Sequence, residues 1–382
     1  MFRMSARYYL CIAAVLLGLF ARLWLWWRFI GAADAHIWSQ HGAEVLVHGI
    51  AHTYQSVVIF NHPPIMGWLA AIWSYFSHGD LVVFSRWLKI PGLIGEIITL
   101  ALLWRVASPV AAAVYALSPV AILLSGFHGN TDALCAALIL AGVVAADRKH
   151  WFTAGALFAV GINVKLVPLL LLPILLSSVP WRALPRLAAG LAFAVIPFLP
   201  PALSAASAMR ENILNYIPTT QDWGVIVFLG HATARDWYVA NGRFVVLAVI
   251  VLFAIWARFQ RNLSVANRMA VGCAIWLVLT PGFGLQYLIY AMPLLCLVDR
   301  GYALLWSCSA GAMLAVEYWT GLEAGAHPQT SWIPHITELQ PALRLGIVAA
   351  TVLVCFVAAQ LRRQVVPGQG LEPATLSPTE RP

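Results

Sequence analysis

The chain has 382 residues, of which 61% are hydrophobic and only 10% are charged. A soluble globular protein carries roughly a quarter charged residues and about half apolar ones, so this composition excludes a soluble enzyme and a disordered chain. The net charge of +8 does not indicate nucleic-acid binding, because the basic residues lie in short patches at the ends of apolar runs. We predict an all-α, multi-pass membrane protein.

Spanning a bilayer takes about 20 apolar residues, and runs of that order, some of them a little shorter, recur along the chain. They lie near 8–30, 81–104, 107–125, 131–146, 185–201, 240–257, 264–280, 284–298, 302–320 and 340–361. Two further segments are ambiguous. Residues 63–77 form a short run that begins with two prolines, and residues 151–179 are apolar except for Asn163 and Lys165.

The distribution of basic residues decides both cases, because cytoplasmic loops carry an excess of Lys and Arg. We treat 63–77 as a helix on the outer surface and 151–179 as two short helices that meet at an outer turn. The following residues then all become cytoplasmic: Arg105, Arg148, Lys149, Arg182, Arg186, Arg258, Arg261, Arg300, Arg362 and Arg363. The prediction is about 12 membrane segments, both termini in the cytoplasm, and a long first outer loop, 31–80, that carries surface helices.

The chain is predicted to form one transmembrane domain over residues 1–363. The remainder, 364–382, is rich in Pro, Gly, Ser and Thr, a composition that does not support a packed core. We expect a disordered cytoplasmic tail.

Asp34 is the first candidate for chemistry, because it follows the first span within about one turn, in GAADAHIW. A carboxylate at the membrane boundary can accept a proton from a nucleophile that attacks a lipid-linked substrate. The alternative is that Asp34 caps a helix that begins at Ala35.

The outer segment GFHGNTD places three polar side chains, those of His128, Asn130 and Asp132, within five residues at a membrane edge. A sugar needs many hydrogen-bond partners of this kind. The alternative is that Asn130, Thr131 or Asp132 caps the helix that follows.

Lys165 lies in the middle of a long apolar stretch, where an ammonium is costly without a partner. A phosphate headgroup at the membrane surface would be a suitable partner, and Arg210 in MRENILNY could provide a second phosphate contact. The alternatives are that the Lys165 side chain extends to the interface and that Arg210 is a solvated loop residue.

The first outer loop holds six of the eleven histidines, among them His36, His41, His48 and His52. No HExxH pattern is present and no cysteine lies in this loop, so we predict hydrogen bonding to sugar hydroxyls or carboxylates rather than a metal site. A divalent metal is possible but not favoured, and no other cofactor is predicted. The remaining candidates for sugar or acceptor binding lie in FNHPP and PGFGLQY: His62, Gln286 and Tyr287.

With these motifs (GAADAH, FNHPP, GFHGNTD, NVKLVP and FGLQYL), roughly residues 1–300 resemble the GT-C superfamily of integral-membrane glycosyltransferases. The resemblance implies a polyprenyl-phosphate-linked sugar as donor and inversion at the anomeric carbon. It assigns Asp34 to the first-loop acid and Lys165 to a basic residue near the donor phosphate. Many members carry a second acid near the first, and here His36 occupies the last place of such a DxD, which argues against metal dependence.

The favoured function is therefore hexose transfer from a polyprenyl-phosphate donor to a glycan, lipid or protein acceptor. We expect the active site at the outer, periplasmic face of the inner cell membrane, with membrane lipids and no nucleic acid as partners. A transporter or flippase of a lipid-linked or polar solute is the alternative, although its polar residues would be expected deep in the spans rather than on one side. A polymerase or ligase of lipid-linked glycans would use the same outer-face chemistry on a longer donor.

Overall fold

The computed structural model describes residues 6–57, 59–215, 222–323 and 340–365. Within these ranges the chain forms helices and contains no β-strand element, so the predicted all-α class is confirmed. Of the predicted disordered tail, 364–382, the first two residues belong to a helix, Gln340–Val365, and the rest lies outside the described residues.

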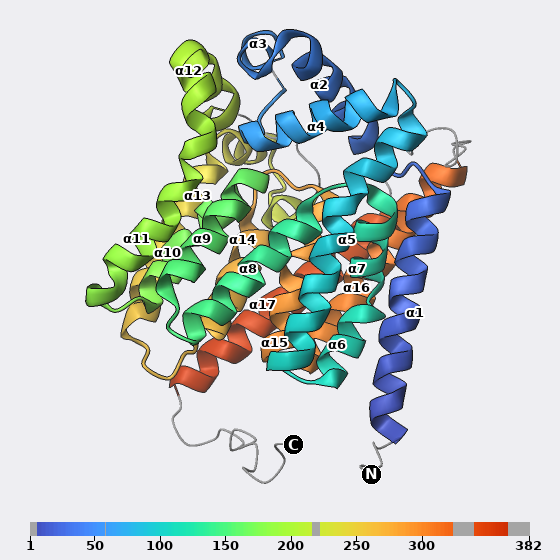
Figure 1. Cartoon of the computed structure of the whole chain (residues 1–382). Coiled ribbons are helices and arrows are strands. Elements are labelled where there is room, and N and C mark those ends of the chain that lie inside the picture. The colour runs from blue at the N-terminus through green and yellow to red at the C-terminus, as the bar shows by residue number, and fades with distance from the viewer. Residues whose placement is uncertain (1–5, 58, 216–221, 324–339, 366–382) are drawn as a thin grey trace, which may run out of the picture.

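The helices form a bundle with a separate layer of three helices across one end (Figure 1). The layer contains α2 (Asp34–His48), α3 (Ile50–Ser56) and α4 (Pro64–Ser77). The bundle contains α1 (Ala6–Arg28), α5 (Leu81–Val106), α6 (Pro109–Ala116), α7 (Pro119–Ile122), α8 (Asp132–Asp147), α9 (Trp151–Val164), α10 (Val167–Ser178), α11 (Leu184–Leu191), α13 (Ala232–Phe259), α14 (Val265–Leu279), α15 (Ala291–Val298), α16 (Arg300–Glu323) and α17 (Gln340–Val365).

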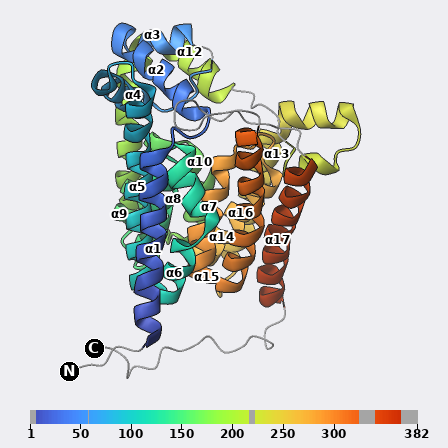
Figure 2. The ribbon, with the colours of Figure 1, turned by 90° about the vertical axis from the view of Figure 1, so that its right-hand side faces the viewer.

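One further helix, α12 (Leu199–Leu214), extends from the bundle to the layer (Figure 2). There the Asn212 side-chain amide donates to the carbonyl oxygens of Tyr54 and Val57, at 2.8 and 3.1 Å. Six short segments complete the described structure: the π-helix η1 (Leu123–His128) and the 3-10 helices η2 (Trp181–Ala183), η3 (Ala192–Ala194), η4 (Ile196–Phe198), η5 (Gly224–Phe228) and η6 (Leu285–Ile289).

Several of these helices are long and apolar enough to cross a membrane. Five in the described ranges meet both criteria, and α6 with α7 and η1 would add a sixth if that bent pair, with an angle of 57°, is one span. Four shorter apolar segments accompany them: Trp151–Val164, Val167–Ser178, Val265–Leu279 and Leu285–Val298. The chain is therefore a multi-pass membrane protein, as its composition predicts.

Local sequence explains where several helices begin and end. Pro64 is the first residue of α4, a position where a missing N–H costs nothing. The Asp80 carboxylate then caps α5 by accepting from the backbone N–H groups of Val82 and Val83, at 2.7 and 3.1 Å. The predicted division of 151–179 into two short helices is confirmed, because α9 ends and α10 begins on either side of Lys165.

A fully buried ion pair joins α1, α5 and α6 inside the bundle. Arg22 Nε donates to Glu96 Oε2 at 2.8 Å, and Tyr115 donates its hydroxyl hydrogen to Glu96 Oε1 at 2.9 Å. The Arg22 guanidinium also donates to the carbonyl oxygen of Ala116 at 2.6 Å. Charges inside a membrane bundle are tolerated only when they are paired in this way, so the network fixes how α1 packs.

Glu96→Ala is expected to lower the free energy of unfolding by about 3–5 kcal/mol, because it leaves the Arg22 charge buried without its partner. Denaturant unfolding in detergent micelles measures the change. Glu44→Ala is the matched control, since Glu44 pairs with His52 at a partly exposed site, where an ion pair contributes at most about 1 kcal/mol. Equal small losses in the two variants would contradict this role of Glu96.

Two basic residues of α5 hold the C-terminal end of α1. Lys89 Nζ donates to the carbonyl oxygen of Phe29 at 2.6 Å, and Arg86 donates to that of Trp27 at 3.1 Å. Cations are favourable at the negative end of a helix dipole, where the last carbonyl groups lack partners. These contacts determine where the chain leaves α1 on its way to Asp34.

Candidate functional site

Asp34 is brought to the GFHGNTD segment because the chain that follows α1 closely approaches the end of η1. Gly31 has a φ of +107°, and a Cβ at this position would lie 2.2 Å from the carbonyl oxygen of Phe127, so only glycine fits here. The backbone N–H of Ala32 donates to the carbonyl oxygen of His128 at 2.9 Å. Asp34 follows directly as the first residue of α2.

The Asp34 carboxylate is held by two side chains of that segment. Asn130 Nδ2 donates to Asp34 Oδ2, and His128 Nε2 lies 3.3 Å from the same oxygen. His128 is fully buried, and its Nδ1 lies 2.7 Å from the hydroxyl of Tyr318 in α16. This spacing suits a Tyr318 hydroxyl that donates to Nδ1 and an Nε2–H that donates to Asp34, so the carboxylate is held in one orientation. The helix α2 begins at Asp34 itself and has no side-chain cap, so Asp34 does not cap a helix that begins at Ala35.

Lys165 has a buried acidic partner instead of reaching the interface alone. Its backbone is extended at the break between α9 and α10, and its Nζ donates to both carboxylate oxygens of Asp132 at 2.8 Å. The Tyr290 hydroxyl donates to Asp132 Oδ1 at 2.8 Å. On another side, the Lys165 ammonium lies 5.0 Å from the centre of the Tyr287 ring, within cation–π distance.

A cavity of about 470 Å³ joins Asp34 and Lys165. Its wall includes six of the predicted site residues: Asp34, His62, Asn130, Lys165, Gln286 and Tyr287. Aromatic rings complete it, with the Trp38 and His62 rings 4.4 Å apart between centres. Both the volume and the mixture of apolar wall with a few polar groups are typical of a small-molecule site.

The other four predicted site residues do not line this cavity. His128 and Asp132 lie behind its wall, where they hold Asp34 and Lys165. His36 is placed on α2 with its Nε2 3.0 Å from Gln40 Nε2, and Arg210 is exposed on α12. The structure therefore does not bring His36 or Arg210 to the cavity.

Two tyrosines of the site were missed in the sequence. Tyr318 and Tyr290 lie in the predicted spans 302–320 and 284–298, where an aromatic residue is ordinary. Their hydroxyls contact His128 and Asp132, from segments about 190 and 158 residues away along the chain. No local pattern indicates such contacts.

Burial keeps two cavity histidines neutral. It lowers the pKa of His41 to about 4. The pKa of His62 is lowered to about 3, mainly by burial, with the Lys165 charge and His41 acting in the same direction and Asp34 against them. At neutral pH both rings can therefore donate and accept hydrogen bonds without carrying charge.

The pH dependence of stability is expected to follow from these two rings. In the unfolded chain a histidine binds a proton below about pH 6.5, whereas the folded protein resists protonation until the pH approaches 4 at His41. The free energy of unfolding should therefore fall as the pH is lowered from about 6.5 to about 4. Thermal unfolding at pH 7.5 and 4.5 measures this, and His41→Phe should reduce the loss.

His48→Phe serves as the control, since the His48 side chain is exposed in α2 and its ring meets water in both states. It should keep the pH dependence of the unaltered protein. An unchanged loss of stability in His41→Phe would show that His41 does not resist protonation in the folded state.

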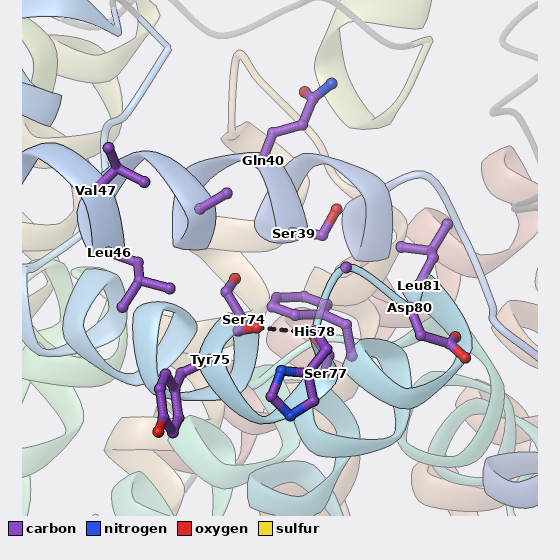
Figure 3. Close-up of a pocket in the computed structure, with 13 residues that line it drawn as sticks. Ser39, Gln40, Leu46, Val47, Ser74, Tyr75, Ser77, His78, Asp80 and Leu81 are labelled. Atoms are coloured by element: carbon purple, nitrogen blue, oxygen red, sulfur yellow. Dashed lines mark hydrogen bonds between the residues drawn. The ribbon is translucent and has the colours of Figure 1, made fainter.

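A second cavity, of about 510 Å³, lies between α2, the end of α4 and the start of α5 (Figure 3). Leu46, Val47 and Tyr75 are among the side chains around it. None of the predicted site residues lines it. In the part of the chain that the structure describes, no three His, Cys, Asp or Glu side chains are grouped closely enough to hold a metal ion.

Comparison with known proteins identifies a family. The profile of glycosyltransferase family 87 matches residues 60–281, more than half of the chain. No curated protein matches the sequence significantly. Two similar solved structures are those of ArnT from Cupriavidus metallidurans, in the apo state and bound to undecaprenyl phosphate. Each is 15% identical; they cover 94% and 93% of this chain and 77% of theirs, with TM-scores of 0.49 and 0.48.

Proposed function

The chain belongs to glycosyltransferase family 87, and we propose that it transfers a hexose from a polyprenyl-phosphate-linked donor to an acceptor hydroxyl. Family membership makes it an integral-membrane glycosyltransferase, in agreement with the GT-C resemblance, and favours this reading over a transporter or flippase. The observation that carries the proposal is that Asp34 and Lys165 line one cavity. The Asp34 carboxylate can take a proton, and the Lys165 ammonium can face a phosphate.

The proposed reaction is a single displacement at the anomeric carbon. The acceptor oxygen forms the new bond to this carbon as the bond to the phosphate oxygen breaks, so the configuration inverts. The acceptor proton passes to the Asp34 carboxylate, which Asn130 and His128 hold in place. The bonding electrons leave with the polyprenyl phosphate, whose growing negative charge faces the Lys165 ammonium.

The sugar is proposed to lie between these two groups. His62, Asn130 and Gln286 supply hydrogen-bonding groups to the cavity wall, as a polar ring with many hydroxyls requires. The rings of Trp38 and Tyr287 supply apolar faces on which a sugar can stack. The acceptor is proposed to be a glycan, lipid or protein whose hydroxyl enters from the side of Asp34.

We further propose that the cavity faces the periplasm and that the chain crosses the inner membrane in about 12 segments, as one domain over residues 1–363. The proposal is supported by the basic residues, which the predicted topology places on the cytoplasmic side. It is also supported by the layer of α2, α3 and α4, which lies at the end of the bundle opposite the start of α1 (Figure 2).

Transfer is proposed to need no divalent metal, because the leaving phosphate faces Lys165 and Asp34 has no second acid beside it in the sequence. We expect activity to survive EDTA, since neither proposed step requires an ion. Product formation before and after chelation, with manganese or magnesium added back, measures this. Activity lost on chelation and restored by either ion would contradict the proposal.

The proposed function is tested with the purified full-length protein and a panel of polyprenyl-phosphate monosaccharides. Mass spectrometry detects both the free polyprenyl phosphate and the glycosylated acceptor in a membrane extract. The expected result is cleavage of at least one hexose donor, dependent on Asp34. Binding of none of the donors, together with no cleavage, would overturn the proposal.

A further inference from the structure

The Lys165 ammonium has a carboxylate on one side and the cavity on the other. Both oxygens of Asp132 accept from Lys165 Nζ at 2.8 Å, and the Tyr290 hydroxyl holds one of them in place. The Lys165 side chain is 11% exposed and lines the cavity, whereas that of Asp132 is only 3% exposed and does not line it. A phosphate in the cavity therefore meets a cation that already has a partner.

The proposed reaction changes the charge that faces this cation. A sugar joined to polyprenyl phosphate forms a phosphodiester, which carries one negative charge. The product is a phosphomonoester, which at pH 7 carries about −1.5 to −2 because its second pKa is about 6. An ammonium without a partner would hold the product more tightly than the donor, since attraction grows with charge, and slow product release limits turnover in many enzymes.

We propose that Asp132 competes with the product phosphate for Lys165 and so sets the rate at which polyprenyl phosphate leaves. The inference rests on the proposed function, because it takes Lys165 as the phosphate contact. The fixed carboxylate offsets the ammonium charge for both lipids, and it repels the more highly charged product more strongly. Asp132 thus acts through Lys165, as a positioning and charge-balancing residue.

The test compares the unaltered protein with Asp132→Asn, which keeps the shape of the side chain and an acceptor for Tyr290. The expected result is about tenfold or more tighter binding of undecaprenyl phosphate at pH 7.5. Steady-state turnover should fall, while single-turnover transfer should stay within a few-fold. Microscale thermophoresis in detergent and quench-flow assays measure these quantities.

A pH series separates this role from a structural one. The affinity gain in Asp132→Asn should be larger at pH 7.5 than at pH 5, because the phosphomonoester gains its second charge in between. A polyprenyl phosphodiester should show no such difference. Tyr290→Phe is the matched control: it removes one hydrogen bond but no charge, so its affinity for undecaprenyl phosphate should stay within about threefold.

The inference is overturned if Asp132→Asn binds undecaprenyl phosphate equally or more weakly while it is folded, as judged by thermal unfolding. The unaltered protein provides a measurement that needs no variant. It should bind undecaprenyl phosphate and the phosphodiester within about threefold of each other at pH 7.5, and a tenfold preference for the monoester would also overturn the inference. Binding of neither lipid would instead be a failure of the proposed function.

Discussion

Asp34→Asn is expected to abolish sugar transfer while the protein stays folded and still binds the donor lipid. Asparagine keeps the shape of the side chain, and α2 begins without a side-chain cap that the substitution could remove, but asparagine cannot accept the proton. General base catalysis contributes about 10²–10⁴-fold, so the loss should appear in turnover rather than in donor affinity. Product formation and donor binding, measured on the same preparation, give the two quantities.

Asp80→Asn is the matched control, because it makes the same substitution at the same end of the bundle. Asp80 caps α5 and lines the second cavity rather than the one with Asp34, so transfer should be unchanged. Near-normal turnover in Asp34→Asn would make Asp34 a sugar-binding group. Asp132, the other acid near the cavity, would then be examined as the base, although its carboxylate is paired with Lys165.

Lys165→Ala is expected to weaken both donor binding and turnover. A hydrogen bond to a charged group contributes about 1.5–3 kcal/mol, and an ammonium–phosphate contact acts in the bound donor as well as in the transition state. We therefore expect about a ten- to hundredfold loss in donor affinity, together with slower transfer. Titration with a polyprenyl-phosphate sugar and single-turnover assays separate the two effects.

Two further variants show whether the ammonium itself is responsible. Lys165→Met keeps most of the length of the side chain and removes its charge, so it should resemble Lys165→Ala. Arg210→Ala should bind donor within about threefold of the unaltered protein, because Arg210 is exposed on α12 and does not line the cavity. If Arg210→Ala lost donor affinity strongly and Lys165→Ala did not, Arg210 and not Lys165 would be the contact to the donor phosphate.

The class of the protein follows from its sequence because membrane solvation imposes a simple rule on composition. With 61% hydrophobic residues and few charges, the chain could satisfy its backbone in a bilayer only as helices or as a closed barrel. Runs of about 20 apolar residues indicate helices. The break at Lys165 follows from the same rule, since one ammonium in a long apolar stretch needs a particular environment.

The candidate residues were also visible in the sequence, because polar groups at membrane edges are costly and therefore few. Asp34, Asn130 and Lys165 stand out on that ground and all line the cavity. His36 and Arg210 stood out equally, yet their places on α2 and α12 leave both outside the cavity wall. Sequence position alone does not determine which side of a helix faces a site formed by other segments.

The sequence by itself therefore determined the helical membrane class and the short list of polar candidates, through hydropathy and charge. Only the tertiary structure decided their partners: His128 joins Asp34 to Tyr318, and Asp132 joins Lys165 to Tyr290. Each partnership links segments far apart along the chain. The first arises because α16 packs against η1, and the second because η6 and α15 pack against α8. A tyrosine within an apolar run carries no local mark of the hydroxyl contact that such packing creates.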